Sequence, residues 1–276
     1  MQYLSYKNTE HILEENMHGQ VLYLTYPKLE ETGVVKHGFS TRLGGVSEGM
    51  YESMNLSFAQ GDREENVRGN YRRMAMAIGV EVENVVKPMQ THTTNVCKVT
   101  AENKDNDFQD VDGLITNVPG ICLATTYADC VPLFFVDPVH KAIGLSHSGW
   151  RGTVGKIGAV TIQKMKEEYG TNPEDVVAAI GPSICQDCYE VSEDVIIKFQ
   201  EAFHEQHWPV LFYEKANKKY QLNLWKANEI IMQEAGVKRE NIAVTNVCTN
   251  CNSDILHSHR ATNGKRGALG AFLSIK

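Results

Sequence analysis

The order of apolar strands and amphipathic helices along the chain predicts an α/β protein built on a parallel sheet. Three observations support this expectation. Residues 131–136 form a continuous apolar run, which is typical of a strand buried on both faces. Residues 152–169 have helical spacing and end at Gly170, and residues 176–180 then form another buried strand. Strand, helix and strand therefore follow one another.

The other elements are expected from the same two patterns. Runs rich in Val, Leu, Tyr and Phe predict further strands over 21–26, 34–41, 95–100, 112–116, 121–126, 142–146, 241–248 and 268–275. Helical spacing predicts further helices over 62–78, 192–203 and 224–235. Asp62 with Glu65 indicates a capping box, while Ser192 and Asn223 are the expected caps of the other two helices.

Composition and charge limit the class of protein. With 276 residues, 42% of them hydrophobic and 22% charged, the chain can bury a substantial core as one domain spanning 1–276. The net charge is −7 and the basic residues are scattered, so neither a nucleic-acid partner nor a membrane surface is expected, and no protein partner is evident. Without a leader-like N-terminus or a long apolar run, the expected location is cytoplasmic.

Seven cysteines, an odd number, argue against a complete disulfide framework. Four of them form two CxxC pairs, Cys185 with Cys188 and Cys248 with Cys251. The pairs are much farther apart than the roughly 15–20 residues of zinc-ribbon spacing. We therefore expect packing or incidental thiols, open to redox chemistry, rather than a four-cysteine zinc site.

Chemistry-bearing side chains stand at the ends of two neighbouring strands. Cys130 directly precedes the strand over 131–136, and His147 directly follows the strand over 142–146. A thiol beside an imidazole can be a pair of metal ligands or a nucleophile with its base. His92 lies where another strand begins and is a candidate third ligand. Taken alone it would be a surface histidine, since the chain has ten.

Two basic segments are candidate anion sites. Arg42 precedes a Gly-Gly loop whose backbone amides could face phosphate, although, taken alone, the loop is better explained as a tight hairpin. The densest basic group consists of His259, Arg260, Lys265 and Arg266. It is either a solvated loop or the second half of an anion clamp opposite Arg42. The helix that begins after Arg151 would also favour an anion at its N-terminus.

Eight motifs occur in an order that is specific to one known family. They are HGFSTRLGG (37–45), NLS (55–57), QTH (90–92), DGLIT (112–116), ADCVPL (128–133), HSGWRG (147–152), GPSI (181–184) and SHR (258–260). From about residue 20 onward the chain resembles the YfiH/YlmD family, also called the laccase-domain or polyphenol oxidase family. The CxxC pairs make it most similar to the YlmD branch. Many relatives carry a second arginine after Arg260, where this chain has Ala261.

The resemblance implies a different fold from the strand and helix pattern. It implies an α+β protein with four layers, α/β/β/α, and mixed sheets. It also implies a zinc ion, with copper as the alternative, held by His92, Cys130 and His147 with a fourth position open, as catalytic zinc requires. The implied activity is phosphorolysis of adenosine, inosine and methylthioadenosine, together with deamination of adenosine. The implied partners are a small-molecule nucleoside and phosphate.

Candidate roles follow for individual residues. Asp129 would shuttle protons during deamination or orient His147. The candidate catalytic residues are Asp129, Cys130 and His147. The candidates for contacting nucleoside or phosphate are Arg42, Asn55, Gln90, Trp150, Arg151 and Arg260.

Three other functions remain open. A copper-dependent polyphenol oxidase would share the His2Cys site, but the paired HxH motifs of a multicopper cluster are lacking. A metal-free cysteine hydrolase, for example one that edits peptidoglycan precursors, would use Cys130 as its nucleophile and an imidazole as base. A zinc-stabilised nucleoside-binding module would bind its ligand without turnover.

Overall fold

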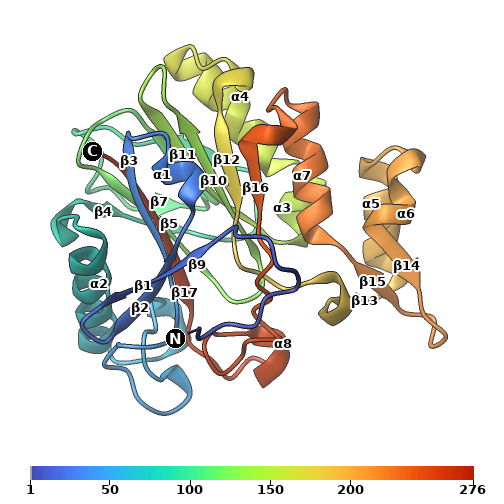
Figure 1. The fold of residues 1–276 in the computed structure, drawn as a ribbon, viewed down its shortest axis with the longest axis horizontal. Helices are drawn as coiled ribbons and strands as arrows, with labels where there is room; N and C mark the ends of the chain where they lie inside the picture. The colour runs from blue at the N-terminus through green and yellow to red at the C-terminus, as the bar shows by residue number, and fades with distance from the viewer. Residues whose placement is uncertain (1) are drawn as a thin grey trace.

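The computed structural model describes residues 2–276 and contains two six-stranded sheets packed face to face (Figure 1). The first sheet has the order β1 (Glu14–His18), β2 (Val21–Thr25), β3 (Val35–Ser40), β17 (Leu269–Ile275), β9 (Cys122–Tyr127) and β4 (Val85–Val86). The second has the order β16 (Ile242–Val244), β12 (Val177–Ile180), β10 (Val131–Asp137), β11 (Ala142–Ser148), β8 (Gly113–Thr116) and β6 (Val96–Lys98).

Helices cover the outer face of each sheet. The first sheet carries α2 (Glu64–Ile78), and the second carries α4 (Ile157–Tyr169) and α7 (Leu224–Glu234). This is the four-layer α/β/β/α arrangement that the family resemblance implied, and it is confirmed. The single parallel sheet is wrong. Short turns such as residues 138–141 between β10 and β11 can join only antiparallel strands, and each large sheet is mixed.

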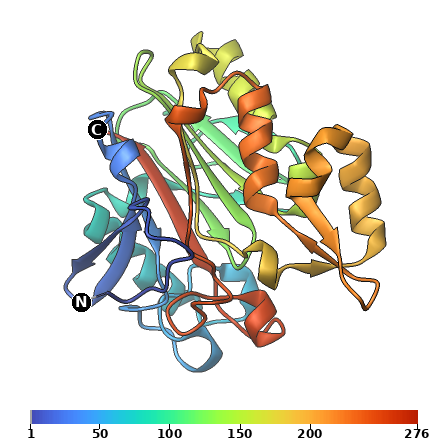
Figure 2. The same ribbon diagram turned by 45° about the vertical axis from the view of Figure 1, so that its right-hand side comes forward.

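A smaller unit projects from the edge of the second sheet (Figure 2). It comprises the three-stranded sheet β13 (Glu190–Val191), β15 (Tyr220–Leu222) and β14 (Phe212–Glu214), with α5 (Glu193–Ala202) and α6 (Trp208–Leu211). The remaining short elements are α1 (Pro27–Glu30), α3 (Trp150–Val154), α8 (His259–Thr262) and the pair β5 (Pro88–Met89) and β7 (Phe108–Gln109).

The apolar run in β10 is explained by burial on both faces. Leu133 and Phe135 pack in the layer beneath α4 and α7, whereas Phe134 and Val136 pack between the two sheets. All four side chains are fully buried. Each such side chain contributes roughly 1.5–3 kcal/mol to the hydrophobic driving force. A strand without polar alternation therefore fits the centre of this sandwich.

Helix ends differ from the expected caps in three places. Asp62 accepts hydrogen bonds from Ser47 and Asn55, and α2 begins two residues later. The expected helix over 152–169 is broken between α3 and α4, because Lys156 adopts a left-handed conformation with φ 58°. Before α5, the Ser192 hydroxyl binds Asp194 instead of capping the helix. Asn223 does cap α7.

Among residues 2–276, no helix is both long enough and apolar enough to cross a lipid bilayer.

A buried histidine in β3 gives stability a defined pH dependence. His37 Nε2 accepts a hydrogen bond from the Tyr26 backbone N–H at 2.7 Å, and burial lowers the pKa of His37 to about 4. The unfolded chain, with a histidine pKa near 6.5, binds the proton first as pH falls. Stability from this group is therefore complete above about pH 6.5 and is lost between about 6.5 and 4.

We expect this loss to reach about 2 kcal/mol at pH 5. Urea unfolding at pH 7.5 and pH 5, with chelator present, measures it. A His37→Gln variant keeps a neutral acceptor at that position, so its pH-dependent loss should be smaller than that of the wild type by this amount. Equal losses in the two proteins would contradict the assignment to His37.

Candidate metal centre

Three side chains meet at one end of the core layer between the two sheets. His92 comes from the loop between β5 and β6, Cys130 from the turn that crosses from β9 to β10, and His147 from the end of β11. Their ligand atoms all lie within 4.8 Å of one another. Cys130 Sγ is 3.9 Å from His92 Nε2. The structure therefore brings together the three side chains for which the resemblance implied metal binding.

The position of His147 follows from strand periodicity. Ile143 and Leu145 point into the layer between the sheets, so His147 lies on the same face at the end of that core. Its ring contacts the Tyr127 ring, with centroids 5.4 Å apart. Pro132 pairs directly with His147 across the two strands, which brings Cys130 alongside.

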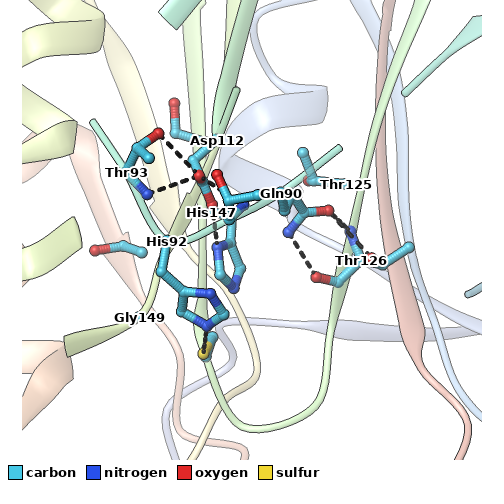
Figure 3. A network of polar contacts seen from close by, with 12 residues as sticks. Gln90, His92, Thr93, Asp112, Thr125, Thr126, His147 and Gly149 are labelled. Carbon is cyan, nitrogen blue, oxygen red and sulfur yellow. Dashed lines mark hydrogen bonds and ion pairs between the residues drawn. The ribbon is translucent and has the colours of Figure 1, made fainter. Parts of the chain in front are cut away.

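Asp112 links the two histidines through its carboxylate (Figure 3). Its Oδ1 lies 2.8 Å from His147 Nδ1, which directs His147 Nε2 to the metal position. Its Oδ2 accepts hydrogen bonds from the backbone N–H groups of Thr91 and Thr93 at 3.1 and 2.8 Å. One carboxylate therefore orients His147 and fixes the residues on both sides of His92. The suggestion that Asp129 orients His147 is wrong.

Backbone conformation and the absence of a side chain also shape the centre. His92 and Asp129, the residue before Cys130, both have positive φ, 67° and 87°. Such conformations cost energy in residues other than glycine and gather at functional sites. A Cβ on Gly149 would lie 3.0 Å from His92 Cδ2 and 3.1 Å from Cys130 Sγ. Glycine at position 149 lets the chain pass beside the ligands.

The ionisable side chains at this centre shift one another's pKa values. Burial alone raises the pKa of the Cys130 thiol, but the imidazoles of His147 and His92 outweigh it and lower that pKa to about 6. Burial lowers the pKa of His147, but the Cys130 sulfur and the Asp112 carboxylate raise it to about 9. Despite burial, His147 and the two amides hold the pKa of Asp112 at about 2. The pocket thus favours a thiolate, the form that binds metals.

A cleft of about 530 Å³ opens onto the three ligands. Its other lining residues include the aromatic side chains of Phe58 and Tyr71 and the basic side chains of Lys87 and Arg266. Phe58 is 38% exposed and stacks on Tyr71. Arg266 Nε is buried without a hydrogen-bond partner among residues 2–276. Cavities of this size and mixed character hold small-molecule ligands.

Of the expected ligand contacts, Gln90 lines this cleft and Asn55 does not. The Gln90 amide exchanges hydrogen bonds with the Thr126 backbone, so it ties the loop before His92 to β9 (Figure 3). Asn55 is fully buried and binds the Ala268 N–H and the Asp62 carboxylate. The structure gives Asn55 an internal role in place of the expected contact with substrate.

The clamp between Arg42 and Arg260, one of the two alternatives for the basic cluster, is not formed by the contacts of these two side chains. The guanidinium of Arg42 donates to the carbonyls of Glu52 and Ser253, away from the cleft. That of Arg260 donates to the carbonyls of Cys188 and Glu190. Both side chains are thus engaged in holding loops. The arginine that does line the cleft is Arg266.

The remaining candidates lie around a second hollow of about 330 Å³, which Trp150 and Arg260 both line. Arg151 stacks over the Trp150 ring at 4.4 Å. The Asp129 carboxylate accepts hydrogen bonds from the Thr249 hydroxyl at 2.6 Å and the Arg260 N–H at 2.7 Å. Asp129 therefore faces these two loops, contrary to the expected position of a proton shuttle in the cleft.

Comparison with known proteins agrees with the fold. Residues 36–276 match the profile of a family described as multi-copper polyphenol oxidoreductase laccase. The chain belongs to this laccase family. Within it, the chain is 35% identical over 250 residues to a Bacillus subtilis protein named purine nucleoside phosphorylase YlmD, covering 87% of this chain and 88% of that protein.

Two further relatives extend the comparison. A protein from an unknown prokaryotic organism named adenosine deaminase RL5 is 34% identical over 233 residues, covering 80% of this chain and 87% of that one. The crystal structure of YlmD from Geobacillus stearothermophilus superposes with a TM-score of 0.89 at 31% identity, covering 96% of this chain and 99% of that one. The laccase-family fold therefore extends over nearly the whole chain.

Sequence reasoning missed three residues around this laccase-family centre. Asp112 lies in the DGLIT motif, but nothing in the motif indicates that its carboxylate meets His147. Phe58 looks like any core aromatic in the sequence, because exposure is not visible there. Arg266 was recognised only as part of a basic cluster. Asp112 and Arg266 both lie in segments that stand out in the sequence, but their contacts depend on the folded structure.

We expect Asp112→Asn to weaken zinc binding by roughly 10–100-fold, the usual effect of losing a partner of a metal-binding histidine. An amide NH2 placed opposite the Thr91 and Thr93 N–H groups would repel them and loosen the loop at His92. Competition with a chromophoric chelator measures the affinity. Asp107→Asn is the matched control, because Asp107 is an exposed aspartate a few residues before Asp112. Equal affinity in both variants would contradict the role of Asp112.

Proposed function

We propose that the protein is a zinc-dependent purine nucleoside phosphorylase that acts on adenosine, inosine and methylthioadenosine, with adenosine deamination as a side activity. One observation carries the proposal. The His92, Cys130 and His147 cluster opens onto a cleft that also holds an exposed aromatic ring and a half-buried arginine. The names of the relatives support the same chemistry.

The donor set fits zinc. Two imidazoles and one thiolate leave a fourth position open, as in catalytic zinc sites, whereas structural sites use four protein ligands. A zinc ion bound there would supply Lewis acidity at the floor of the cleft. The family description names copper, but this cluster offers a place for one ion only. We therefore favour zinc over an oxidase.

The lining residues divide into two roles. The partly exposed ring of Phe58 lines the cleft and would contact a purine, and Lys87 Nζ lies 4.8 Å from the centre of that ring. Arg266 donates from Nη1 to the Gly267 carbonyl and keeps its Nε free to donate to phosphate. Holding phosphate and nucleoside in one cleft would set the attacking oxygen against the anomeric carbon.

Zinc-loaded protein should convert adenosine to adenine and ribose 1-phosphate only when phosphate is present. Chromatography of the products measures this reaction. Cys130→Ala should lower the rate by more than the roughly 10–100-fold typical of lost outer-shell partners, because a metal ligand itself is removed. Cys97→Ala, a partly buried cysteine outside the cluster, should keep full activity.

Other outcomes would redirect the assignment. Inosine formed with or without phosphate would make deamination the main reaction. Unchanged adenosine in every sample would overturn the nucleoside assignment.

A second candidate, a cysteine hydrolase, is favoured by one observation, the low pKa of Cys130 beside His147. Turnover of an amide substrate by protein stripped of zinc would support it, because bound zinc would block attack by the Cys130 sulfur.

Arg266→Ala should raise the KM for phosphate by roughly 10–100-fold, the value of a hydrogen bond to a charged group. The KM for adenosine should change less, because the nucleoside stacks elsewhere in the cleft. Lys265→Ala is the matched control, since Lys265 is the exposed basic neighbour in the same loop. Steady-state kinetics with each substrate varied in turn separates the two constants. An unchanged phosphate KM in Arg266→Ala would remove this residue from the phosphate site.

A further inference from the structure

The two CxxC pairs are far apart in the sequence but meet in the folded structure. Cys185 and Cys188 lie on the turn between β12 and β13, and Cys248 and Cys251 lie on the turn after β16. All four sulfur atoms lie within 4.8 Å of one another. Cys188 Sγ is 3.5 Å from Cys251 Sγ, and Cys248 Sγ accepts a hydrogen bond from the Cys185 N–H at 3.2 Å. Packing thiols were expected, and Cys185 and Cys248 are indeed buried, but the structure also gathers all four sulfur atoms at one point.

Sheet topology explains why distant pairs meet. β12 and β16 are neighbouring parallel strands, with Ile180 paired to Val244, so the chain leaves both strands at the same edge. Ser183 then bridges to Cys248, and the Thr249 N–H binds the Ser183 carbonyl at 3.1 Å. The residues between the pairs form α5, α6, α7 and the small sheet. Zinc-ribbon spacing assumes a single short hairpin and does not apply to ligands from two strands.

We propose that Cys185, Cys188, Cys248 and Cys251 form a second metal site, which binds one Zn²⁺ through four thiolates. In a tetrahedral site with Zn–S distances of about 2.3 Å, the sulfur atoms lie about 3.8 Å apart. The four observed sulfur atoms lie within 4.8 Å of one another, and the Cys188 and Cys251 sulfurs are 3.5 Å apart. Four protein ligands leave no open position, so the site is structural.

The surroundings suit a negatively charged zinc–thiolate group. Lys7 forms an ion pair with Asp187, which lies between the first two cysteines, at 3.2 Å. The backbone N–H of Lys7 binds the Asn246 carbonyl, just before the second pair. A cation therefore stands beside the cluster. Cys185 and Cys248 are buried and Cys251 is exposed, so the ion would be partly shielded from solvent.

This second site would help to hold in place the turn that carries Cys130 in the first site. Thr249 follows Cys248, and its hydroxyl binds the Asp129 carboxylate, directly before Cys130. On the other side, Arg260 donates to the Cys188 carbonyl. An ion that joins the two CxxC turns would therefore hold in place the contacts that fix the Cys130 turn. Its role is positional and separate from the reaction.

Metal content of the intact protein tests the proposal without reference to activity. Cys130→Ala disables the first site, so zinc-loaded and dialysed Cys130→Ala protein should hold one zinc per chain. Cys130→Ala combined with Cys251→Ser should hold none, and Cys130→Ala combined with Cys97→Ser, the matched control, should still hold one. Cobalt loaded into Cys130→Ala should give the strong thiolate-to-cobalt absorption of a tetrathiolate site.

Two results would overturn the proposal. One is Cys130→Ala protein that binds neither zinc nor cobalt after loading under reducing conditions. The other is a Cys188–Cys251 disulfide found by peptide mapping of protein purified without reductant, with no zinc displaced on reduction. Because Cys251 is exposed, Cys251→Ser should fold. Circular dichroism checks this, and Cys188→Ser provides a second variant that should also lose the ion.

Discussion

The carboxylate of Asp112 is the contact on which the candidate centre depends. Its two oxygens join strand β11, which supplies His147, to the loop that supplies His92. His92 would not hold its position without help, because it is exposed and has a left-handed backbone. A buried, ionised carboxylate that accepts several hydrogen bonds is stable only when they are all made together. The fold therefore supplies a preformed cluster.

The sequence identified the three clustered side chains better than the residues that hold them in position. Cys130 and His147 could be placed side by side from strand ends alone, because residues at the ends of adjacent strands meet. His92 required the family resemblance, since its loop has no regular periodicity. Asp129 was suggested as a partner because it adjoins Cys130. Asp129 has a positive φ, and its carboxylate accepts a hydrogen bond from the Thr249 hydroxyl rather than from His147.

The fold shows the same division between local and long-range information. The local patterns located the main strands within a few residues, because burial on both faces leaves continuous apolar runs. They could not give the pairing. β9 and β10 are consecutive and separated by only three residues, yet they belong to different sheets. Likewise, charge could be read from Arg42, Arg260 and Arg266, but only the folded structure shows which guanidinium groups are occupied by carbonyl oxygens.

The place of β17 in the first sheet has a consequence for biosynthesis. This strand comes last along the chain, yet it lies between β3 and β9 and pairs with both. While the ribosome is still translating, the first sheet consists of two separate halves with open edges. Such edges recruit other strands. The nascent chain must therefore be translated through β17 before this half of the sandwich can close, and termination before β17 would leave a protein prone to aggregate.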